Sequence, residues 1–266
     1  MNQVIANHPL DDRLPAMLRS GQRLRGIFNG IPSPALVEMC AYAGFDFVVI
    51  DNEHGSASLE STEHMLRAAR ASGVPAIVRC LSQDIARTLD LGAGGVQIPM
   101  VNNAQEAAEL VQRVRYPAPG GAGGQRGSAF SSRAAGYGAF GGTQHTQRSN
   151  QGIALIAMIE TPDGVANAGA IAAVPGIDAV FIGPNDLSHS MGHENRWSDA
   201  PVQQAIERAL RAIASAGNCP GILALTAQDE EKYAAWGARY FATVRTGVIS
   251  KALKEAAQGG RDGLKY

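Results

Sequence analysis

Ile153-Ala-Leu-Ile-Ala-Met-Ile-Glu160 and Ala179-Val-Phe-Ile-Gly-Pro-Asn-Asp186 are the two stretches that decide the fold of this 266-residue chain. Each is a short apolar run followed by a carboxylate, and such runs are typical of buried parallel strands. Ligands of parallel α/β sheets gather at the carboxyl ends of the strands. We therefore expect Glu160 and Asp186 to share one edge, where two acids suit a hard divalent cation whose other ligands are water and substrate. The alternative is that Glu160 caps the helix that follows its strand and that Asp186 N-caps its own loop.

Similar apolar runs recur along the whole chain and alternate with helical patterns. The runs cover residues 25–29, 45–51, 76–79, 95–99, 153–159, 179–183, 221–225 and 240–244. Amphipathic segments with helix-start or helix-stop residues cover 33–43, 59–71, 103–114, 201–216 and 226–236. This alternation predicts an α/β fold, a (β/α)₈ TIM barrel in one domain over residues 21–266, after an N-terminal extension with a helix over 1–20. An open doubly wound sheet is the alternative, but it lacks a Gly-rich fingerprint after the first strand.

Composition narrows the function classes and the compartment. The net charge is −1, so neither a nucleic-acid nor a membrane partner is expected. No apolar run reaches about 18 residues and no secretory leader is recognised. Cys40, Cys80 and Cys219 are odd in number and widely spaced, which favours reduced thiols and a cytoplasmic location.

Three more ionisable residues occupy informative positions. His54 follows a strand and has Asp51 and Glu53 beside it, as a general base near neutrality requires, although a lone histidine is often structural. Arg79 ends the next strand, where the paired N–H donors of its guanidinium group could bind a carboxylate or an enolate, or form a structural ion pair. Asp90 lies near a helix end, where an acid opposes the helix dipole, so another requirement must hold it there.

The stretch 116–152 has no clear periodicity and is rich in glycine. Loops of this length inside compact domains are functional or disordered. Arg126, Arg133 and Tyr137 could reach an anionic acceptor from this segment, and the alternative is a mobile Gly-rich excursion.

Several motifs in a fixed order resemble those of one known family. They are Phe45-Asp-Phe-Val-Val-Ile-Asp-Asn-Glu-His54, Val78-Arg79, Leu89-Asp-Leu-Gly-Ala-Gly-Gly-Val-Gln-Ile-Pro-Met-Val101, Arg115-Tyr-Pro117, Met158-Ile-Glu-Thr161 and Val180-Phe-Ile-Gly-Pro-Asn-Asp-Leu-Ser188. Together they resemble the HpcH/HpaI family of class II aldolases over residues 26–237. The resemblance implies a (β/α)₈ barrel in a homo-oligomer, from a dimer to a hexamer, whose subunits exchange a C-terminal helix. It also implies a divalent metal, Mg²⁺ first and Mn²⁺ or Co²⁺ as alternatives.

The resemblance also implies a reaction and a set of site residues. The reaction is reversible aldol cleavage or formation of a carbon–carbon bond beside the keto group of pyruvate or a similar 2-oxo acid, with an aldehyde as the second small-molecule partner. Carried over by position, the metal ligands are Glu160 and Asp186, and the base is His54. Arg79 would steady the enolate, and Asp90 would raise the basicity of His54. The backbone of Gly183, Pro184 and Asn185 would touch the substrate carboxylate.

Some positions depart from that pattern. Met158 stands where many pyruvate aldolases carry Gln, so the substrate pocket loses a hydrogen bond there. The spacing between Arg79 and Asp90 is about three residues short. Segments 125–128 and 133–138 look more like the aldolase-fold citrate synthases of siderophore biosynthesis, which condense oxaloacetate with acetyl-CoA. The predicted function is therefore a metal-dependent carbon–carbon lyase, and the alternative is such a synthase with Arg126 and Arg133 on the acceptor's carboxylates. A non-catalytic binding barrel is the third hypothesis.

Overall fold

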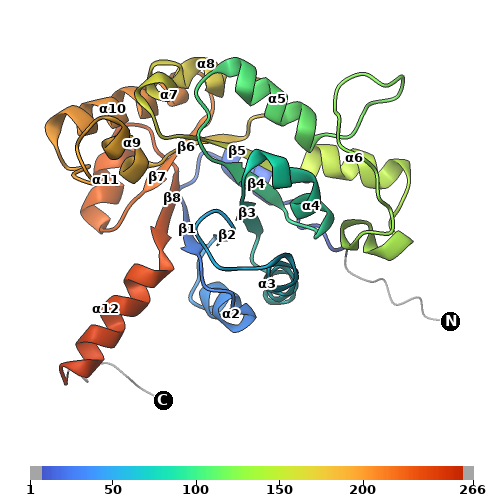
Figure 1. The fold of residues 1–266 in the computed structure, drawn as a ribbon, viewed down its shortest axis with the longest axis horizontal. Helices are drawn as coiled ribbons and strands as arrows, with labels where there is room; N and C mark the ends of the chain where they lie inside the picture. Colours follow the sequence, from blue (N-terminus) through green and yellow to red (C-terminus); the bar gives the residue numbers. More distant parts are fainter. Residues whose placement is uncertain (1–7, 260–266) are drawn as a thin grey trace.

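The computed structural model describes residues 8–259 and shows a closed barrel of eight parallel strands in sequence order (Figure 1). Each strand pairs with the next in the chain, and β1 also pairs with β8. The strands are β1 (Leu24–Asn29), β2 (Phe47–Asp51), β3 (Ala76–Arg79), β4 (Gly95–Ile98), β5 (Ala154–Ile159), β6 (Ala179–Ile182), β7 (Cys219–Leu223) and β8 (Tyr240–Val244).

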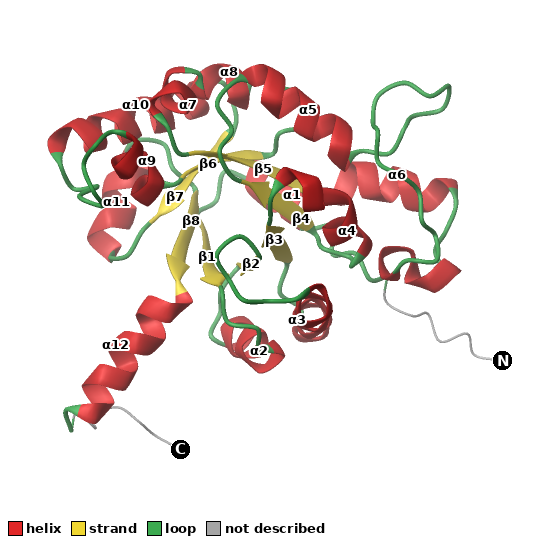
Figure 2. Cartoon of the chain, viewed as in Figure 1, coloured by secondary structure: helices red, strands yellow, loops and turns green. Residues whose placement is uncertain are grey.

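Helices connect the strands around the outside (Figure 2). They are α1 (Leu14–Arg19), α2 (Pro34–Tyr42), α3 (Leu59–Ser72), α4 (Ile85–Asp90), α5 (Ala104–Val114), α6 (Thr143–Gly152), α7 (Pro162–Ala166), α8 (Ala168–Ala172), α9 (Pro184–Ser190), α10 (Ala200–Ser215), α11 (Ala227–Ala235) and α12 (Arg245–Ala257), with 3₁₀ turns at Ser82–Asp84 and Arg133–Gly138. The predicted (β/α)₈ barrel in a single domain is confirmed, and the open-sheet alternative is wrong.

The predicted helix starts correspond to real capping contacts. The side chain of Asn103 accepts a hydrogen bond from the backbone N–H of Glu106 (2.9 Å), and that of Thr226 accepts one from Asp229 (3.0 Å). Each cap satisfies a donor that the first helical turn leaves without a partner. Local sequence therefore sets where these helices begin.

A cluster of apolar side chains fills the inside of the barrel. Side chains that point inward from alternate strand positions fill the barrel, and Phe47 stacks on Tyr240 with ring centroids 4.6 Å apart. Gly26 is required beside them, because a Cβ there would lie 2.0 Å from the Phe47 ring. Leu14 and Leu18 of α1 belong to this inner cluster, so α1 closes the amino end of the barrel. Residues 1–7 of the expected N-terminal extension lie outside the described range.

Two expectations differ from the observed elements. Strand β7 begins at Cys219 and ends at Leu223, two residues before the predicted 221–225 at either end. The stretch 116–152 is partly regular, because it contains a 3₁₀ turn and α6. Helix α6 buries only His145, Ser149 and Gly152, so its sequence carries almost no apolar stripe. Because α5 returns the chain to the amino ends of the strands, this whole segment lies on that side of the barrel.

Helix α12 leaves the barrel instead of packing along it (Figure 1). Its only buried residue is Arg245, whereas Val248 and Leu253 are 51% and 65% exposed. In a (β/α)₈ barrel the last helix normally belongs to the ring around the strands. The exchange of this helix between subunits stays a prediction.

Candidate active site

A pocket of about 210 Å³ opens at the carboxyl ends of the strands. Eight predicted site residues line it, and they are His54, Arg79, Met158, Glu160, Gly183, Pro184, Asn185 and Asp186. Arg79 and Met158 lie in β3 and β5, His54, Glu160 and Gly183 follow β2, β5 and β6, and the other three form the first turn of α9. The closure of the barrel thus brings together residues that lie up to 132 positions apart in sequence, from His54 to Asp186, in one pocket.

Glu160 is the first residue after β5 and is 3% exposed. Its Oε2 accepts a hydrogen bond from the backbone N–H of Met100 (2.9 Å). Its other oxygen packs on Gly183, where a Cβ would lie 2.6 Å from Oε1, so a side chain at 183 would displace the carboxylate. Burial, reinforced by the charges of Glu53 and Asp186, raises the pKa of Glu160 to about 7, although the Met100 N–H and Arg79 oppose the rise.

Neither carboxylate is used as a helix cap, which was the alternative interpretation. Helix α7 is capped by Thr161, whose hydroxyl accepts a hydrogen bond from the N–H of Gly164 (3.1 Å). Helix α9 has Gly183 at its N-cap and Asp186 in its first turn, with no side-chain cap. Both acids therefore remain available to the pocket.

These residues fit a divalent cation held by two carboxylates. Glu160 is an acid that burial and neighbouring acids make costly to ionise, and a cation would remove that cost. In residues 8–259, no group of three or more His, Cys, Asp or Glu side chains forms a closed metal cage. A site with two oxygen ligands and open positions suits Mg²⁺, which keeps waters and binds substrate oxygens.

Arg79 forms a two-pronged ion pair with Asp51. Its Nε and Nη2 lie 2.9 and 2.7 Å from the two Asp51 oxygens, and the two residues are direct neighbours in the β2–β3 register. Burial raises the pKa of Asp51, but the Arg79 guanidinium and the N–H groups of His54 and Glu53 outweigh it, so the pKa is lowered. Arg79 Nη1 also lies 3.2 Å from Glu53 Oε2. Arg79 is thus an ion-pair partner and a pocket-lining cation at once.

His54 stands at the mouth of the pocket. Its side chain is 62% exposed, and its Nε2 lies 3.8 Å from Glu53 Oε2. Its backbone N–H donates to Asp51 (3.3 Å), so the carboxylate that holds Arg79 also fixes the turn that carries the histidine. A histidine in contact with solvent and facing the pocket is placed to exchange protons with both.

The remaining lining residues are Asp51 and four apolar side chains that the sequence patterns did not single out, Phe28, Phe181, Leu223 and Val244. The predicted residue Met158 packs with them and is 2% exposed. Phe181 lies two residues before a predicted site residue, Gly183. The period of two along a strand could therefore have identified Phe181 as an inward-facing neighbour.

Asp90 and Arg126 contact each other, and neither of them lines this pocket in the described chain. Arg126 Nη2 donates to Asp90 Oδ1 (3.0 Å), and its guanidinium lies 4.4 Å from the centre of the Tyr116 ring. Arg133 Nη1 donates to the carbonyl of Leu91. The reason is directional: α4 and α5 run back toward the amino ends of the strands, so residues at their ends lie opposite the pocket. Neither Asp90 nor Arg126 lines the pocket that contains His54, and their roles in the reaction stay predictions.

Active sites of (β/α)₈ barrel enzymes lie at the carboxyl ends of the strands, where this pocket opens, so its position is that of an enzyme acting on a small molecule. Residues 25–252 match the model of the HpcH/HpaI aldolase/citrate lyase family, and the chain belongs to that family. It is an aldolase, a carbon–carbon lyase.

Relatives and solved structures agree with this assignment. The chain is 38% identical to a hydroxypyruvate/pyruvate aldolase of Delftia acidovorans, over 91% of this chain and 88% of the relative. A family member from Burkholderia cenocepacia has a TM-score of 0.88 at 31% identity, covering 95% of this chain and all of that one. The citrate synthase SbnG has a TM-score of 0.81 at 31% identity, covering 93% and 97%. Among the described helices, none combines the length and apolarity needed to cross a membrane.

Proposed function

We propose that this enzyme is a metal-dependent aldolase that cleaves and forms a carbon–carbon bond beside the keto group of pyruvate-like 2-oxo acids. The observation that carries the proposal is the joint presence of Glu160, Asp186, Arg79 and His54 around one pocket of about 210 Å³. That volume is below the range of about 300–1,000 Å³ typical of drug-sized ligands, which favours a small acid. The similarity to a hydroxypyruvate/pyruvate aldolase supports the same substrate class.

The proposed metal site consists of Glu160 and Asp186, with Mg²⁺ first and Mn²⁺ or Co²⁺ as alternatives. A divalent cation bound there supplies Lewis-acid polarisation of the keto oxygen. Arg79, already oriented by Asp51, presents positive charge on the pocket wall where negative charge develops on the substrate. His54 at the mouth takes a proton from the substrate or returns it, and its exposure lets it exchange that proton with water.

Citrate-synthase chemistry is the second candidate, because the fold likeness to SbnG is close. It required Arg126 and Arg133 to meet the carboxylates of oxaloacetate. In this chain Arg126 binds Asp90 and Arg133 binds a backbone carbonyl, both on the opposite side of the barrel. The described chain therefore favours the aldolase.

Two assays separate the candidates. We expect Mg²⁺-dependent exchange of the methyl protons of pyruvate with solvent deuterium, detected by NMR and lost when EDTA removes the metal. Incubation with oxaloacetate and acetyl-CoA should release no free thiol. Prompt release of CoA without proton exchange would reject the aldolase in favour of the synthase.

We propose that the protein is a homo-oligomer, from a dimer to a hexamer, in which α12 docks on a second copy. A hollow of about 220 Å³ lies over β1 and β8, and Phe45, Leu225 and Phe241 line it. Leu225 is 54% exposed there, and Leu253 on α12 is 65% exposed. Both surfaces expose apolar side chains that no helix or barrel face covers in the described chain, and the Arg25–Glu230 ion pair also lines the hollow.

Charge substitution on α12 tests this assembly. We expect Leu253→Glu to lower the mass measured by light scattering, because the carboxylate removes the apolar contact of Leu253 and costs free energy when it is desolvated on docking. Lys254→Glu is the control, since Lys254 is an exposed charged neighbour on the same helix. An unchanged mass for both variants would refute docking through α12.

We also propose a cytoplasmic location with small-molecule partners only, a 2-oxo acid and an aldehyde. The three cysteines are free and buried in the described chain, which agrees with a reducing compartment. Burial raises the pKa of Cys80 and Cys219 to about 12, so neither thiol is reactive near neutrality.

A further inference from the structure

A second hollow lies at the amino end of the barrel, on the opposite side from the candidate active site. It has a volume of about 780 Å³. Its walls come from the end of α1, the residue after α5, and the turns that lead into β6, β7 and β8. The residues that shape its chemistry are Arg19, Arg115, Asp178 and Arg239. No step of the proposed aldolase reaction uses this space.

The charge of this hollow is positive, with three arginines against one aspartate. Asp178 is already engaged: its Oδ2 accepts the N–H of Leu155 (3.0 Å), and its Oδ1 lies 3.0 Å from Arg19 Nη1. Arg115 Nη2 is farther away, 3.6 Å from Oδ2. One carboxylate that also serves a strand N–H cannot neutralise three guanidinium groups, so a net charge of +2 remains.

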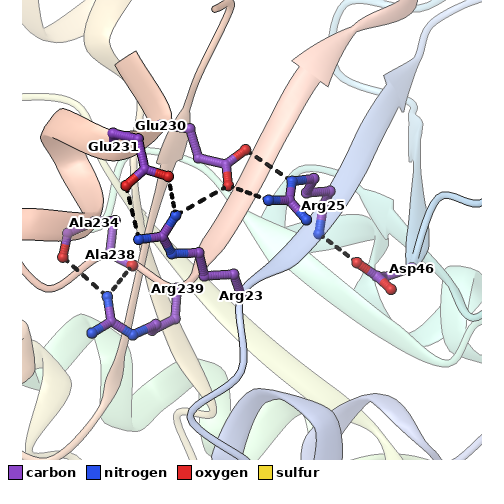
Figure 3. A network of polar contacts seen from close by, with 8 residues as sticks. All are labelled: Arg23, Arg25, Asp46, Glu230, Glu231, Ala234, Ala238 and Arg239. Carbon is purple, nitrogen blue, oxygen red and sulfur yellow. Dashed lines mark hydrogen bonds and ion pairs between the residues drawn. The ribbon is translucent and has the colours of Figure 1, made fainter. Parts of the chain in front are cut away.

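Two of the arginines are held in place by backbone carbonyls. Arg115 Nη1 donates to Ile153 (2.7 Å) and its Nη2 lies 3.3 Å from the carbonyl of Gly176. Arg239 Nη1 donates to Ala234 (3.0 Å) and Ala238 (2.7 Å), as Figure 3 shows. In the described structure these contacts leave the Nε and Nη2 donors of Arg239 without a protein acceptor. Carbonyl contacts orient a guanidinium without cancelling its charge.

Burial makes the charge of Arg115 costly. Its side chain is 15% exposed, and burial lowers the pKa of this arginine despite the attraction of Asp178. A buried cation with weak compensation is stabilised by an anion. Guanidinium groups match the oxygens of carboxylates and phosphates in a two-pronged geometry, which identifies the chemical class of ligand that suits this hollow.

We propose that this hollow is a binding site for a small anionic metabolite carrying phosphoryl or carboxylate groups, separate from the active site. Arg115 and Arg239 hold the anion, and Arg19 lies at the rim, where its 63% exposed side chain can leave Asp178 and reach the ligand. The volume lies within the range of about 300–1,000 Å³ typical of metabolite sites. The site is at the opposite end of the barrel from Glu160, so its ligand does not take part in the aldol reaction.

Calorimetric titration of the Mg²⁺-loaded enzyme with inorganic phosphate and with succinate tests the proposal, and the two probes distinguish the phosphoryl from the carboxylate source. Saturating pyruvate is present throughout to occupy the active site. We expect at least one probe to bind, and Arg239→Gln to weaken it roughly tenfold or more, as the loss of a charge-assisted contact predicts. Arg19→Gln should weaken binding less, since that side chain is largely exposed.

Arg87→Gln is the matched control, because Arg87 is an exposed arginine on α4 that does not line the hollow. Circular dichroism establishes that each variant is folded, and Arg19→Gln keeps the test valid if Arg239→Gln is unstable. The proposal is overturned if neither probe binds, or if all three variants bind like the parent. It is also overturned if Arg239→Gln changes only the oligomeric mass, because a carboxylate of a second copy would then be the partner. If the parent enzyme binds an anion in this hollow but shows no aldolase activity, the proposed function alone is rejected.

Discussion

The pocket at the carboxyl end of the barrel and the hollow at its amino end carry opposite formal charge. At the carboxyl end, Asp51, Glu160 and Asp186 line the pocket with Arg79, and Glu53 lies 3.2 Å from Arg79. At the amino end, three arginines line a hollow with one acid, Asp178, which lies close to Arg19 and Arg115. Arg126 is buried beside Asp90. The net charge of −1 conceals this separation. The comparison teaches that the same scaffold prepares one end for a cation and the other for anions, because barrel closure collects residues that are scattered in sequence.

Removing an acid from the carboxyl end should have the largest effect. We expect Glu160→Ala to lower kcat/KM by roughly 10³-fold or more, because Lewis-acid stabilisation is worth several kcal/mol. Steady-state kinetics with pyruvate and an aldehyde, together with Mn²⁺ titration, measure this. The fold should persist, since Glu160 makes one hydrogen bond, to the Met100 N–H. A variant with parental activity in the presence of EDTA would contradict metal dependence.

Replacing the cation of the carboxyl end should have the next largest effect. Arg79→Lys keeps the charge but cannot make both contacts with Asp51, so the point charge is less well oriented on the pocket wall. We expect kcat to fall by about 10- to 100-fold with a smaller change in KM. Equal kinetics for Arg79→Lys and the parent would show that catalysis does not need the two-pronged contact between the guanidinium group and Asp51.

Removing a cation from the amino end should affect stability and leave kinetics unchanged. Arg126→Met loses the hydrogen bond to Asp90 and the stacking on Tyr116 but keeps much of the side-chain volume. We expect a loss of about 1–3 kcal/mol in urea unfolding and unchanged kcat and KM. A large fall in kcat at parental stability would instead place Arg126 at a substrate, as the sequence suggested.

The smallest effect should be a pH dependence at the amino end. Burial, with the charges of Arg148 and His145, lowers the pKa of His8 to about 4 from 6.5. Between these values the unfolded chain binds a proton that the folded chain excludes, so folding stability falls as the pH drops from about 6.5 toward 4. His8→Gln should therefore show a shallower loss of thermal stability over this range. Identical slopes for variant and parent would show that folding does not change the pKa of His8.

Much of the fold and most of the pocket followed from sequence. The positions of the strands are local properties, because a buried parallel strand needs a continuous apolar run and a helix needs its caps. Since all eight strands point the same way, residues after them had to meet at one end, which brought Glu160 and Asp186 to one pocket with Arg79 and His54. Helix α6 escaped prediction because it buries little apolar surface.

The sequence by itself determined the barrel, the strand-end residues and the family. Only the tertiary structure decided which charges pair: Arg79 with Asp51, Arg126 with Asp90, and Arg19 and Arg115 around Asp178. The physical reason is the distance along the sequence over which each kind of interaction acts. Burial patterns and caps act between residues a few positions apart, whereas each of these ion pairs depends on strand register and helix direction. Many acids are available to each arginine in sequence, and the closed barrel selects the one or two that lie within reach.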